Sequence, residues 1–260
     1  MGEAGEKILV EKKGFVGTIT VNRPEVRNAL NKEAWQGLHE AFAALDRDDD
    51  IRVIVVTGAG DKAFIAGADV NVLKERSPVE TFYGKNSQVV TDIEMVSKPT
   101  IAMINGFCFG GGLEVAMGCD IRIASDDAKL GQTELNVGIL PGAGGTQRLA
   151  RYVGLGKAKE LIFTGKIISA QEAEQIGLVN CVVPKGELLA KTMEMAESIA
   201  AKSPIVTKVA KLVINRGAES DLKSGLQAEL LGQSFVFSTD DHLEGLSAFL
   251  EKREPKFTGK

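Results

Sequence analysis

Apolar residues in the first part of the chain recur with two different periods, which predict strands and a helix. Residues 7–24 alternate apolar and polar positions on both sides of Lys13 and Gly14, which is typical of a β-hairpin. Asn31 precedes a segment with helical spacing, so we expect it to cap a helix that runs to about Asp46. The apolar positions of this helix are Ala34, Trp35, Leu38, Ala41, Phe42 and Leu45.

The middle of the chain continues with strands and helices in turn. Residues 51–58, IRVIVVTG, form an unbroken apolar run of the kind that is buried in a parallel sheet. Residues 100–105, TIAMIN, have the same character. Helices are expected over 78–97 and 113–118, and two short helices and a strand over 154–184.

From Glu187 onward nearly every segment has the pattern of an amphipathic helix. Strands that alternate with helices, followed by a purely helical tail, indicate an α/β fold with a C-terminal helical region. We place the core at residues 1–195 and the helical region at residues 196–260. No tandem repeat or low-complexity linker interrupts either part.

A glycine-rich stretch in the core carries the strongest indication of chemistry. Gly110, Gly111 and Gly112 follow the strand TIAMIN and lead into a short helix. Such a turn aims backbone N–H groups at one point, with the helix dipole behind them, and can bind an anion or an oxygen that becomes negative during a reaction. Taken alone, however, glycines between a strand and a helix are more often packing and turn residues.

Two glutamates in apolar surroundings favour the catalytic interpretation of this stretch. Glu114 lies in GLEVAM and Glu134 in TELNVGIL. A carboxyl group in such a setting tends to have a raised pKa, which suits proton transfer near neutral pH. The structural alternative for Glu114 is a charge that complements the start of a helix.

A competing motif follows the strand at residues 51–58. Gly58, Gly60 and Ala63 fit the G-x-G-x-x-A pattern of dinucleotide-binding folds. That fold needs a helix to begin within the glycines and an acidic residue at a strand end about 20 residues later. The chain instead continues as a glycine-containing loop, and Glu80 lies in a helical pattern, so we discount a dinucleotide site.

Composition and charge argue against several classes of protein. The 260 residues carry a net charge of −4, and the pI near 5.5 argues against a nucleic-acid partner. No apolar run reaches the length of a membrane span, and the start, MGEAGEK, lacks the apolar core of a signal peptide. Cys108, Cys119 and Cys181 have no metal-ligand spacing, and His39 and His242 lie in amphipathic helices. We therefore expect a cytoplasmic protein without a metal site.

The stretch GGGLEVAMGCDIRIASDDAKLGQTELNVGILPGAGGTQRLAR resembles the signature of the enoyl-CoA hydratase (crotonase) superfamily. The glycines, both glutamates and the turn PGAGGTQRL fall in the family's order. Further similar segments are AFIAGADV, TGKIISAQEAEQIGLVN and DDHLEGLSAFLEKR, so that the resemblance covers nearly the whole chain.

The resemblance implies a crotonase-like spiral of ββα units and a helical tail that serves trimer formation. It implies reversible syn hydration of a trans-2-enoyl-CoA to a 3-hydroxyacyl-CoA. The N–H groups of Ala68 and Gly111 would form an oxyanion hole, while Glu114 holds the water and Glu134 exchanges a proton with the α-carbon. The implied substrate-binding residues are Ala66, Gly67, Ala68, Asp69, Val70, Asn71, Gly110 and Lys252.

The implied partners are an acyl-CoA thioester and further copies of the chain, in a homotrimer or a hexamer built as a dimer of trimers. No redox cofactor or metal is required, since coenzyme A is part of the substrate. One departure concerns Asn71, where the family often carries a lysine that can help to hold CoA; Lys74 follows three residues later.

Two other kinds of function stay open at this point. An enoyl-CoA isomerase or another acyl-CoA enzyme of the superfamily would use the same oxyanion hole, although an isomerase needs only one carboxylate. A member of the fold that binds acyl-CoA or RNA without catalysis belongs to a different class. Turnover of crotonyl-CoA separates an enzyme from such a binding protein.

Overall fold

The computed structural model describes residues 6–260 and contains three successive units of strand, strand and helix. The expected ββα spiral is thereby confirmed. Residues 1–5, which begin the acidic start on which the expected absence of a signal peptide rests, lie outside the described part. The first unit comprises β3 (Val53–Gly58), β4 (Ala63–Ile65), α2 (Val70–Glu75), α3 (Pro78–Phe82) and α4 (Lys85–Met95). The second comprises β5 (Thr100–Ile104), β6 (Phe107–Phe109) and α5 (Gly111–Gly118); the third comprises β7 (Ile121–Ser125), β8 (Lys129–Gly131), the 3-10 helix η2 (Glu134–Val137), α6 (Gly145–Val153) and α7 (Leu155–Thr164).

Each unit gives its first strand to a large sheet and its second strand to a small one. The large sheet has the order β1-β2-β3-β5-β7-β10, and the small sheet has the order β4-β6-β8-β9. The remaining strands are β1 (Ile8–Lys13), β2 (Val16–Val21), β9 (Ile168–Ser169) and β10 (Cys181–Val183). β1 and β2 form the predicted antiparallel hairpin, whereas β2, β3, β5, β7 and β10 run parallel.

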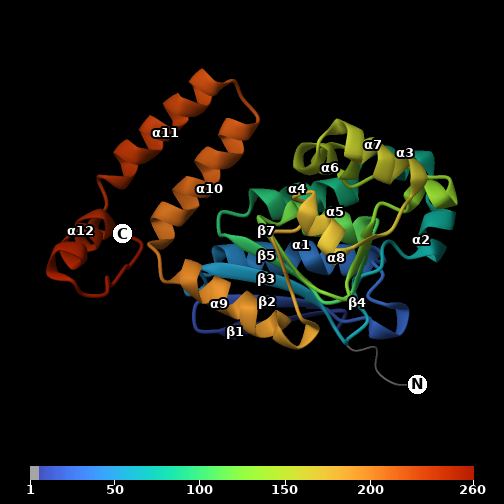
Figure 1. Cartoon of the computed structure of the whole chain (residues 1–260), viewed down its shortest axis with the longest axis horizontal. Helices are drawn as coiled ribbons and strands as arrows, with labels where there is room; N and C mark the ends of the chain where they lie inside the picture. Colours follow the sequence, from blue (N-terminus) through green and yellow to red (C-terminus); the bar gives the residue numbers. More distant parts are fainter. Residues whose placement is uncertain (1–5) are drawn as a thin grey trace.

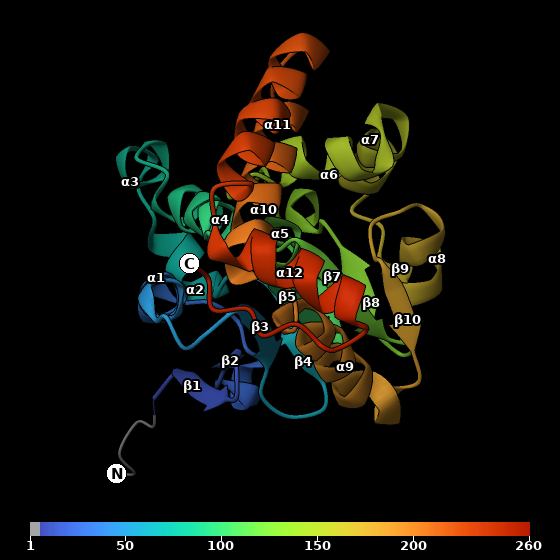
Figure 2. The ribbon, with the colours of Figure 1, turned by 90° about the vertical axis from the view of Figure 1, so that its left-hand side faces the viewer.

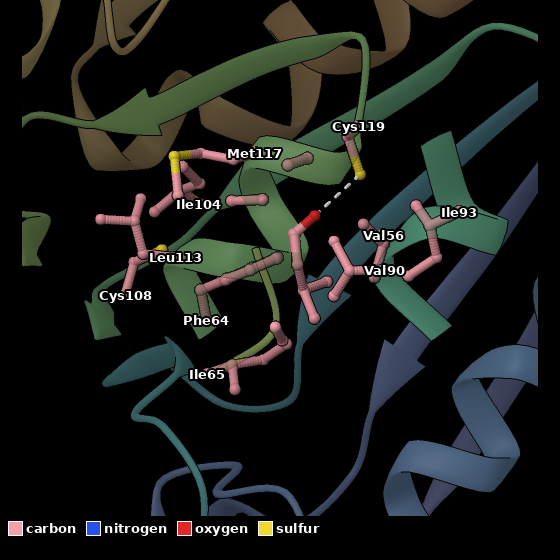
Figure 3. Close-up of a cluster of buried hydrophobic side chains, with 14 of the residues drawn as sticks. Val56, Phe64, Ile65, Val90, Ile93, Ile104, Cys108, Leu113, Met117 and Cys119 are labelled. Carbon is pink, nitrogen blue, oxygen red and sulfur yellow. Dashed lines mark hydrogen bonds between the residues drawn. The ribbon is translucent and has the colours of Figure 1, made fainter. Parts of the chain in front are cut away.

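Strand β3 shows why the apolar run at residues 51–58 is continuous. Alternate side chains of a strand point to opposite faces, and both faces of this sheet are covered. Val53 and Val55 pack with residues of α9 (Leu188–Ala200), while Ile54 and Val56 belong to the larger core with α1 (Lys32–Arg47) and α5. Figure 1 shows the strands between these helices, and Figure 3 shows part of the larger core around Leu113 and Met117.

Three of the predicted helices can be compared with the structure at their ends and breaks. Asn31 caps α1 as expected, since its side chain accepts a hydrogen bond from the N–H of Ala34 at 3.0 Å. The single helix predicted over 78–97 was wrong, because Gly84 adopts a left-handed conformation (φ 59°) and separates α3 from α4. Helix α5 begins at Gly111, two residues earlier than predicted.

The dinucleotide alternative fails on the segment after β3. A nucleotide-binding unit requires a helix there, but the chain forms β4 at Ala63–Ile65, which pairs with β6 in the small sheet.

The C-terminal helices extend from the core on one side. They are α10 (Pro204–Ala218), α11 (Leu222–Val236) and α12 (Asp240–Glu251), and Figures 1 and 2 show the α10–α11 pair projecting away from the sheets. Residues 195 and 196 both lie inside α9, which packs on the large sheet. We therefore propose that the helical region begins after α9, at Pro204. The chain also contains η1 (Pro24–Val26), α8 (Ala170–Gln175) and η3 (Lys185–Glu187).

Across residues 6–260 no helix combines the length and apolar character needed to cross a membrane.

Candidate active site

The turn from β6 into α5 depends on three glycines with different requirements. Gly110 has φ 50° and ψ −121°, a backbone conformation that side-chain-bearing residues rarely adopt. Gly112 packs against β4 so closely that a Cβ there would lie 2.1 Å from the carbonyl oxygen of Ile65. This contact brings the N-terminal end of α5 against the end of β4, just before the loop that carries Ala68.

The backbone N–H groups of Ala68 and Gly111 lie close together. The nitrogen of Ala68 is 3.8 Å from the point where a Cβ on Gly111 would sit. Among the described residues 6–260, neither N–H donates a hydrogen bond to a protein acceptor. Since backbone donors in folded proteins are almost always paired, two free donors at one place are suited to an oxygen atom of a ligand.

Glu114 lies one turn into α5 and is almost completely buried, with 3% of its surface exposed. Its Oε1 atom accepts hydrogen bonds from the N–H groups of Ala143 at 2.7 Å and Gly145 at 2.8 Å. Burial raises the pKa of Glu114, although these two N–H groups and the positive charge of Arg148 oppose the shift. The second glycine-rich turn therefore orients this carboxyl group and leaves Oε2 for another contact.

Glu134 is the second buried carboxyl group of the candidate site and begins the 3-10 helix η2. Burial raises its pKa to about 7, and the nearby charge of Glu114 adds to the shift. With its amide nitrogen turned toward Glu134, Gln132 donates to this carboxyl group, at 2.9 Å from Oε2 and 3.0 Å from Oε1. A Cβ on Gly110 would lie 3.0 Å from Oε1 of Glu134, so the carboxyl group adjoins the glycine turn.

The turn from Gly142 to Gly145 brings the two glutamates together. A Cβ on Gly145 would lie 2.9 Å from Oε1 of Glu114 and 2.5 Å from the amide of Gln132, which in turn contacts Glu134. Arg148 connects this turn to α4. It donates a hydrogen bond to the Ala143 carbonyl oxygen at 3.2 Å and forms an ion pair with Glu94 of α4 at 2.6 Å. The chain thus positions both carboxyl groups through elements far apart in sequence.

Trp35 is the side chain nearest to Gly111. Its Cζ2 atom lies 3.2 Å from the point of a Cβ on Gly111, and the residue is 5% exposed. Within residues 6–260 its indole Nε1–H is one of two buried side-chain groups without a hydrogen-bond partner. Such an unpaired group costs about 1–3 kcal/mol.

The structure places most other predicted site residues around Ala68. The N–H of Ala66 donates to the Arg27 carbonyl oxygen at 3.1 Å, and the Gly67 carbonyl oxygen accepts from the N–H of Leu30 at 2.8 Å. Asp69 caps α2 and forms an ion pair with Arg23 at 3.4 Å, while Val70 and Asn71 are exposed on α2.

Lys252 is the exception, because it does not lie with the other predicted site residues. It is the exposed C-cap of α12. Figure 1 shows α12 and α2 at opposite ends of the molecule, so Lys252 does not share a site with the loop around Ala68 in one chain.

Sequence reasoning missed Trp35 and Gln132 as site residues. Trp35 was assigned to the core by its helical spacing, and only its place as the single tryptophan of the chain marked it out. Gln132 lies two residues before Glu134, a spacing that in a strand places two side chains on the same face. Over residues 6–260 no three side chains of His, Cys, Asp or Glu are placed to hold a metal ion.

Chemically, the arrangement couples two functions. Two free N–H groups can polarise a carbonyl group, and two carboxyl groups with raised pKa values can carry a proton to and from an adjacent carbon.

Comparison with known proteins identifies, over nearly the full length of the chain, the family that its motifs resemble. A family model described as enoyl-CoA hydratase/isomerase matches residues 11–260. A short-chain-enoyl-CoA hydratase of Clostridium acetobutylicum is 43% identical over 249 residues, 95% of each chain. A crotonyl-CoA hydratase of Syntrophomonas wolfei is 42% identical over 259 residues, 99% of this chain and 100% of the relative.

A solved structure agrees with the sequence comparisons. The crystal structure of an enoyl-CoA hydratase from Bacillus anthracis matches with a TM-score of 0.95 and 42% identity, covering 98% of this chain and 100% of that one. The resemblance inferred from the glycine and glutamate motifs is therefore confirmed, and the chain belongs to the enoyl-CoA hydratase/isomerase family of the crotonase superfamily.

Proposed function

We propose that this protein is an enoyl-CoA hydratase, which adds water reversibly across the double bond of a trans-2-enoyl-CoA. The observation that carries the proposal is the placement of two buried glutamates with raised pKa values beside two N–H groups that have no acceptor among residues 6–260. The two relatives described above are named for the same reaction, which supports it further.

The thioester carbonyl oxygen accepts hydrogen bonds from the N–H groups of Ala68 and Gly111. These donors stabilise the negative charge that develops when water attacks the β-carbon and an enolate forms. Glu114, as the carboxylate, takes a proton from the attacking water, and Glu134, as the acid, delivers a proton to the α-carbon. One C–O bond and one C–H bond form on the same face, and the pair again holds one proton at the end.

Two carboxyl groups favour hydration over isomerisation. An isomerase moves one proton between two carbons, for which one carboxyl group suffices. Addition of water moves one proton off oxygen and another onto carbon, and Glu114 and Glu134 provide a group for each transfer. The reaction needs no redox cofactor or metal, because the two carboxyl groups and the two N–H groups supply the chemistry. CoA enters as part of the substrate.

The proposal extends to the residues that contact CoA. The residues from Ala66 to Asn71 line the start of the acyl-CoA site, with Lys74 on the same helix as the nearest counterpart of the lysine missing at Asn71. Because Lys252 lies far from this loop within one chain, we propose that it contacts CoA only from a second copy.

The three free cysteines support a reducing, cytoplasmic location.

We also propose that the chain assembles as a homotrimer or as a dimer of trimers. The helices beyond α9 expose many large apolar side chains, including Leu230 (70%), Leu231 (73%), Phe249 (81%) and Leu250 (79%). Apolar surface of this extent on projecting helices is typical of an interface between subunits. Light scattering at micromolar concentration should give a mass of three or six chains of 27.7 kDa. A monomer under these conditions would contradict the assembly.

The direct test of the function is turnover of crotonyl-CoA, followed by the loss of its enoyl-thioester absorbance and by identification of 3-hydroxybutyryl-CoA as the product. Formation of a β,γ-unsaturated thioester instead would indicate an isomerase. Binding of crotonyl-CoA without any product would indicate a protein that only binds acyl-CoA.

The pH dependence of this turnover reports on Glu134. Catalysis requires one proton on the glutamate pair, and the pKa of about 7 for Glu134 marks the loss of that proton. We therefore expect kcat/KM to fall above about pH 7 and to approach a tenfold loss per pH unit. Because hydration takes up no net proton, the profile should be the same for dehydration. A kcat/KM that is constant from pH 6 to 9, with circular dichroism showing folded protein throughout, would contradict the role of Glu134.

A further inference from the structure

The start of helix α1 is connected to the loop that carries Ala68. The N–H of Leu30 donates to the carbonyl oxygen of Gly67 at 2.8 Å, and the N–H of Asp69 donates to the carbonyl oxygen of Leu30 at 2.9 Å. These two bonds flank Ala68 on both sides, and Leu30 itself is buried. The position of the Ala68 N–H is therefore set by the residue that immediately precedes the cap of α1.

The same helix also approaches Gly111, the residue of the other N–H group, through Trp35. Cζ2 and Cη2 of Trp35 lie 3.2 Å and 3.8 Å from the point of a Cβ on Gly111, and the Ala68 nitrogen is 3.8 Å from the same point. The first turn of α1 is rigidly defined, because the Asn31 side chain accepts from the N–H of Ala34 at 3.0 Å and the Asn31 carbonyl oxygen accepts from the N–H of Trp35 at 3.0 Å. Residues 30–35 therefore lie against both residues that carry the N–H groups, Ala68 and Gly111.

The indole of Trp35 is not explained by stability alone. Buried tryptophans usually find a partner for their N–H, but the Nε1–H of Trp35 has none within residues 6–260. A phenylalanine or leucine at this position would fill a core without burying an unpaired donor. Residues that break a local rule of this kind tend to lie at functional sites.

We infer that Trp35 is a positioning residue for the oxyanion hole. Its ring spaces the N–H groups of Ala68 and Gly111 and fills the volume behind them, so that water does not compete for the two donors. This inference rests on the proposed function in one respect, namely that a thioester oxygen binds between these groups. It adds a third residue, on a different helix, on which the hole depends.

The test compares Trp35→Leu and Trp35→Phe with Phe42→Leu, a control that removes an aromatic ring from the core face of the same helix. For crotonyl-CoA we expect Trp35→Leu to lower kcat by at least about tenfold with KM changed by less than about threefold, because misplaced donors weaken the transition state more than substrate binding. Trp35→Phe should give an intermediate kcat. Phe42→Leu should lower the thermal midpoint and leave kcat within about twofold of the parent.

A spectroscopic readout separates positioning from general damage. The absorbance maximum of a conjugated thioester such as cinnamoyl-CoA shifts to longer wavelength when its carbonyl group is polarised by the oxyanion hole. We expect a smaller shift for Trp35→Leu than for the parent, and a full shift for Phe42→Leu. If Trp35→Leu does not fold, the same comparison is made with Trp35→Phe.

Several outcomes would overturn the inference. One is a Trp35 variant with the full spectral shift and a kcat within about twofold of the parent. Another is an equal loss of kcat in Phe42→Leu, which would point to packing in general. If the parent shifts the cinnamoyl-CoA spectrum more than Trp35→Leu does, but does not hydrate crotonyl-CoA, the inference is sustained and the proposed function is refuted. A parent that neither shifts nor turns over would overturn both.

Discussion

The single variants Glu114→Gln and Glu134→Gln should each lower kcat for hydration of crotonyl-CoA by at least about 100-fold, the low end of what a general acid or base contributes. Glutamine preserves the volume of the side chain. At position 114 its amide oxygen can still accept the N–H groups of Ala143 and Gly145, so the turn that orients the residue should remain. What is lost is the ability to take or deliver a proton. The measurement is initial rate on crotonyl-CoA at saturating substrate.

The double variant tests whether the two groups act in one step. If one proton is shared between Glu114 and Glu134, removing the second group should cost little once the first is gone, so the combined loss should be far smaller than the product of the single losses. Multiplicative losses in the folded double variant would contradict the shared step. A large loss for Glu134→Gln with a mild loss for Glu114→Gln would instead support an isomerase. Glu160→Gln, on the exposed face of α7, is the matched control and should be neutral.

Thermal stability distinguishes catalytic from structural glutamates. The pKa of Glu134 is raised from 4.5 to about 7 in the folded protein, so the folded state binds this proton more tightly than the unfolded chain. This contribution to stability is fully present below pH 4.5 and is lost as the pH rises through 7. Glu134→Gln should therefore melt at a higher temperature than the parent at pH 8 and at a similar one near pH 4.5. A structural role predicts the opposite result, a lower midpoint with the remaining folded protein still active.

The sequence predicted those parts of the fold that depend on local chemistry. The apolar run of β3 is continuous because α1 and α9 cover opposite faces of its sheet, and that pattern was visible without knowledge of either helix. Helix α1 follows from its cap at Asn31 and its spacing. By contrast, Gly84 was not recognised as the break between α3 and α4, since an isolated glycine also occurs inside helices.

The sequence indicated which residues are candidates for the site, but not which contacts they make. The glycines and glutamates stood out by type and spacing, and their family order supported them. The burial that raises the pKa of Glu134, the N–H groups of Ala143 and Gly145 against Glu114, and the ring of Trp35 against Gly111 arise only when separate segments of the chain pack together. Lys252 illustrates the same limit in reverse, because its place on α12 separates it from the loop that sequence similarity assigned to the same ligand.

The neighbouring glycines Gly111 and Gly112 should differ sharply in the effect of an added side chain, and this gives the second prediction of large effect. A side chain on Gly111 would enter the space shared by Trp35 and the Ala68 nitrogen, at 3.2 Å and 3.8 Å from its Cβ. Gly111→Val should therefore obstruct the oxyanion hole and lower kcat for crotonyl-CoA by about 10²–10³, the cost of losing one such donor. Its thermal midpoint should fall less than that of a Gly112 variant, since the nearest contact is a ring edge at 3.2 Å and not a backbone oxygen at 2.1 Å.

Gly112→Ala should behave in the opposite way, because its Cβ would lie 2.1 Å from the backbone oxygen of Ile65 and neither chain segment can move independently. We expect this variant to be poorly folded or strongly destabilised, with activity in proportion to the folded fraction. Gly156→Ala in α7, where a Cβ meets nothing within 4 Å, controls for the substitution itself and should be active and at least as stable as the parent. If Gly111→Val folds and assembles like the parent and keeps near-normal turnover, the Gly111 N–H does not hold the reacting oxygen.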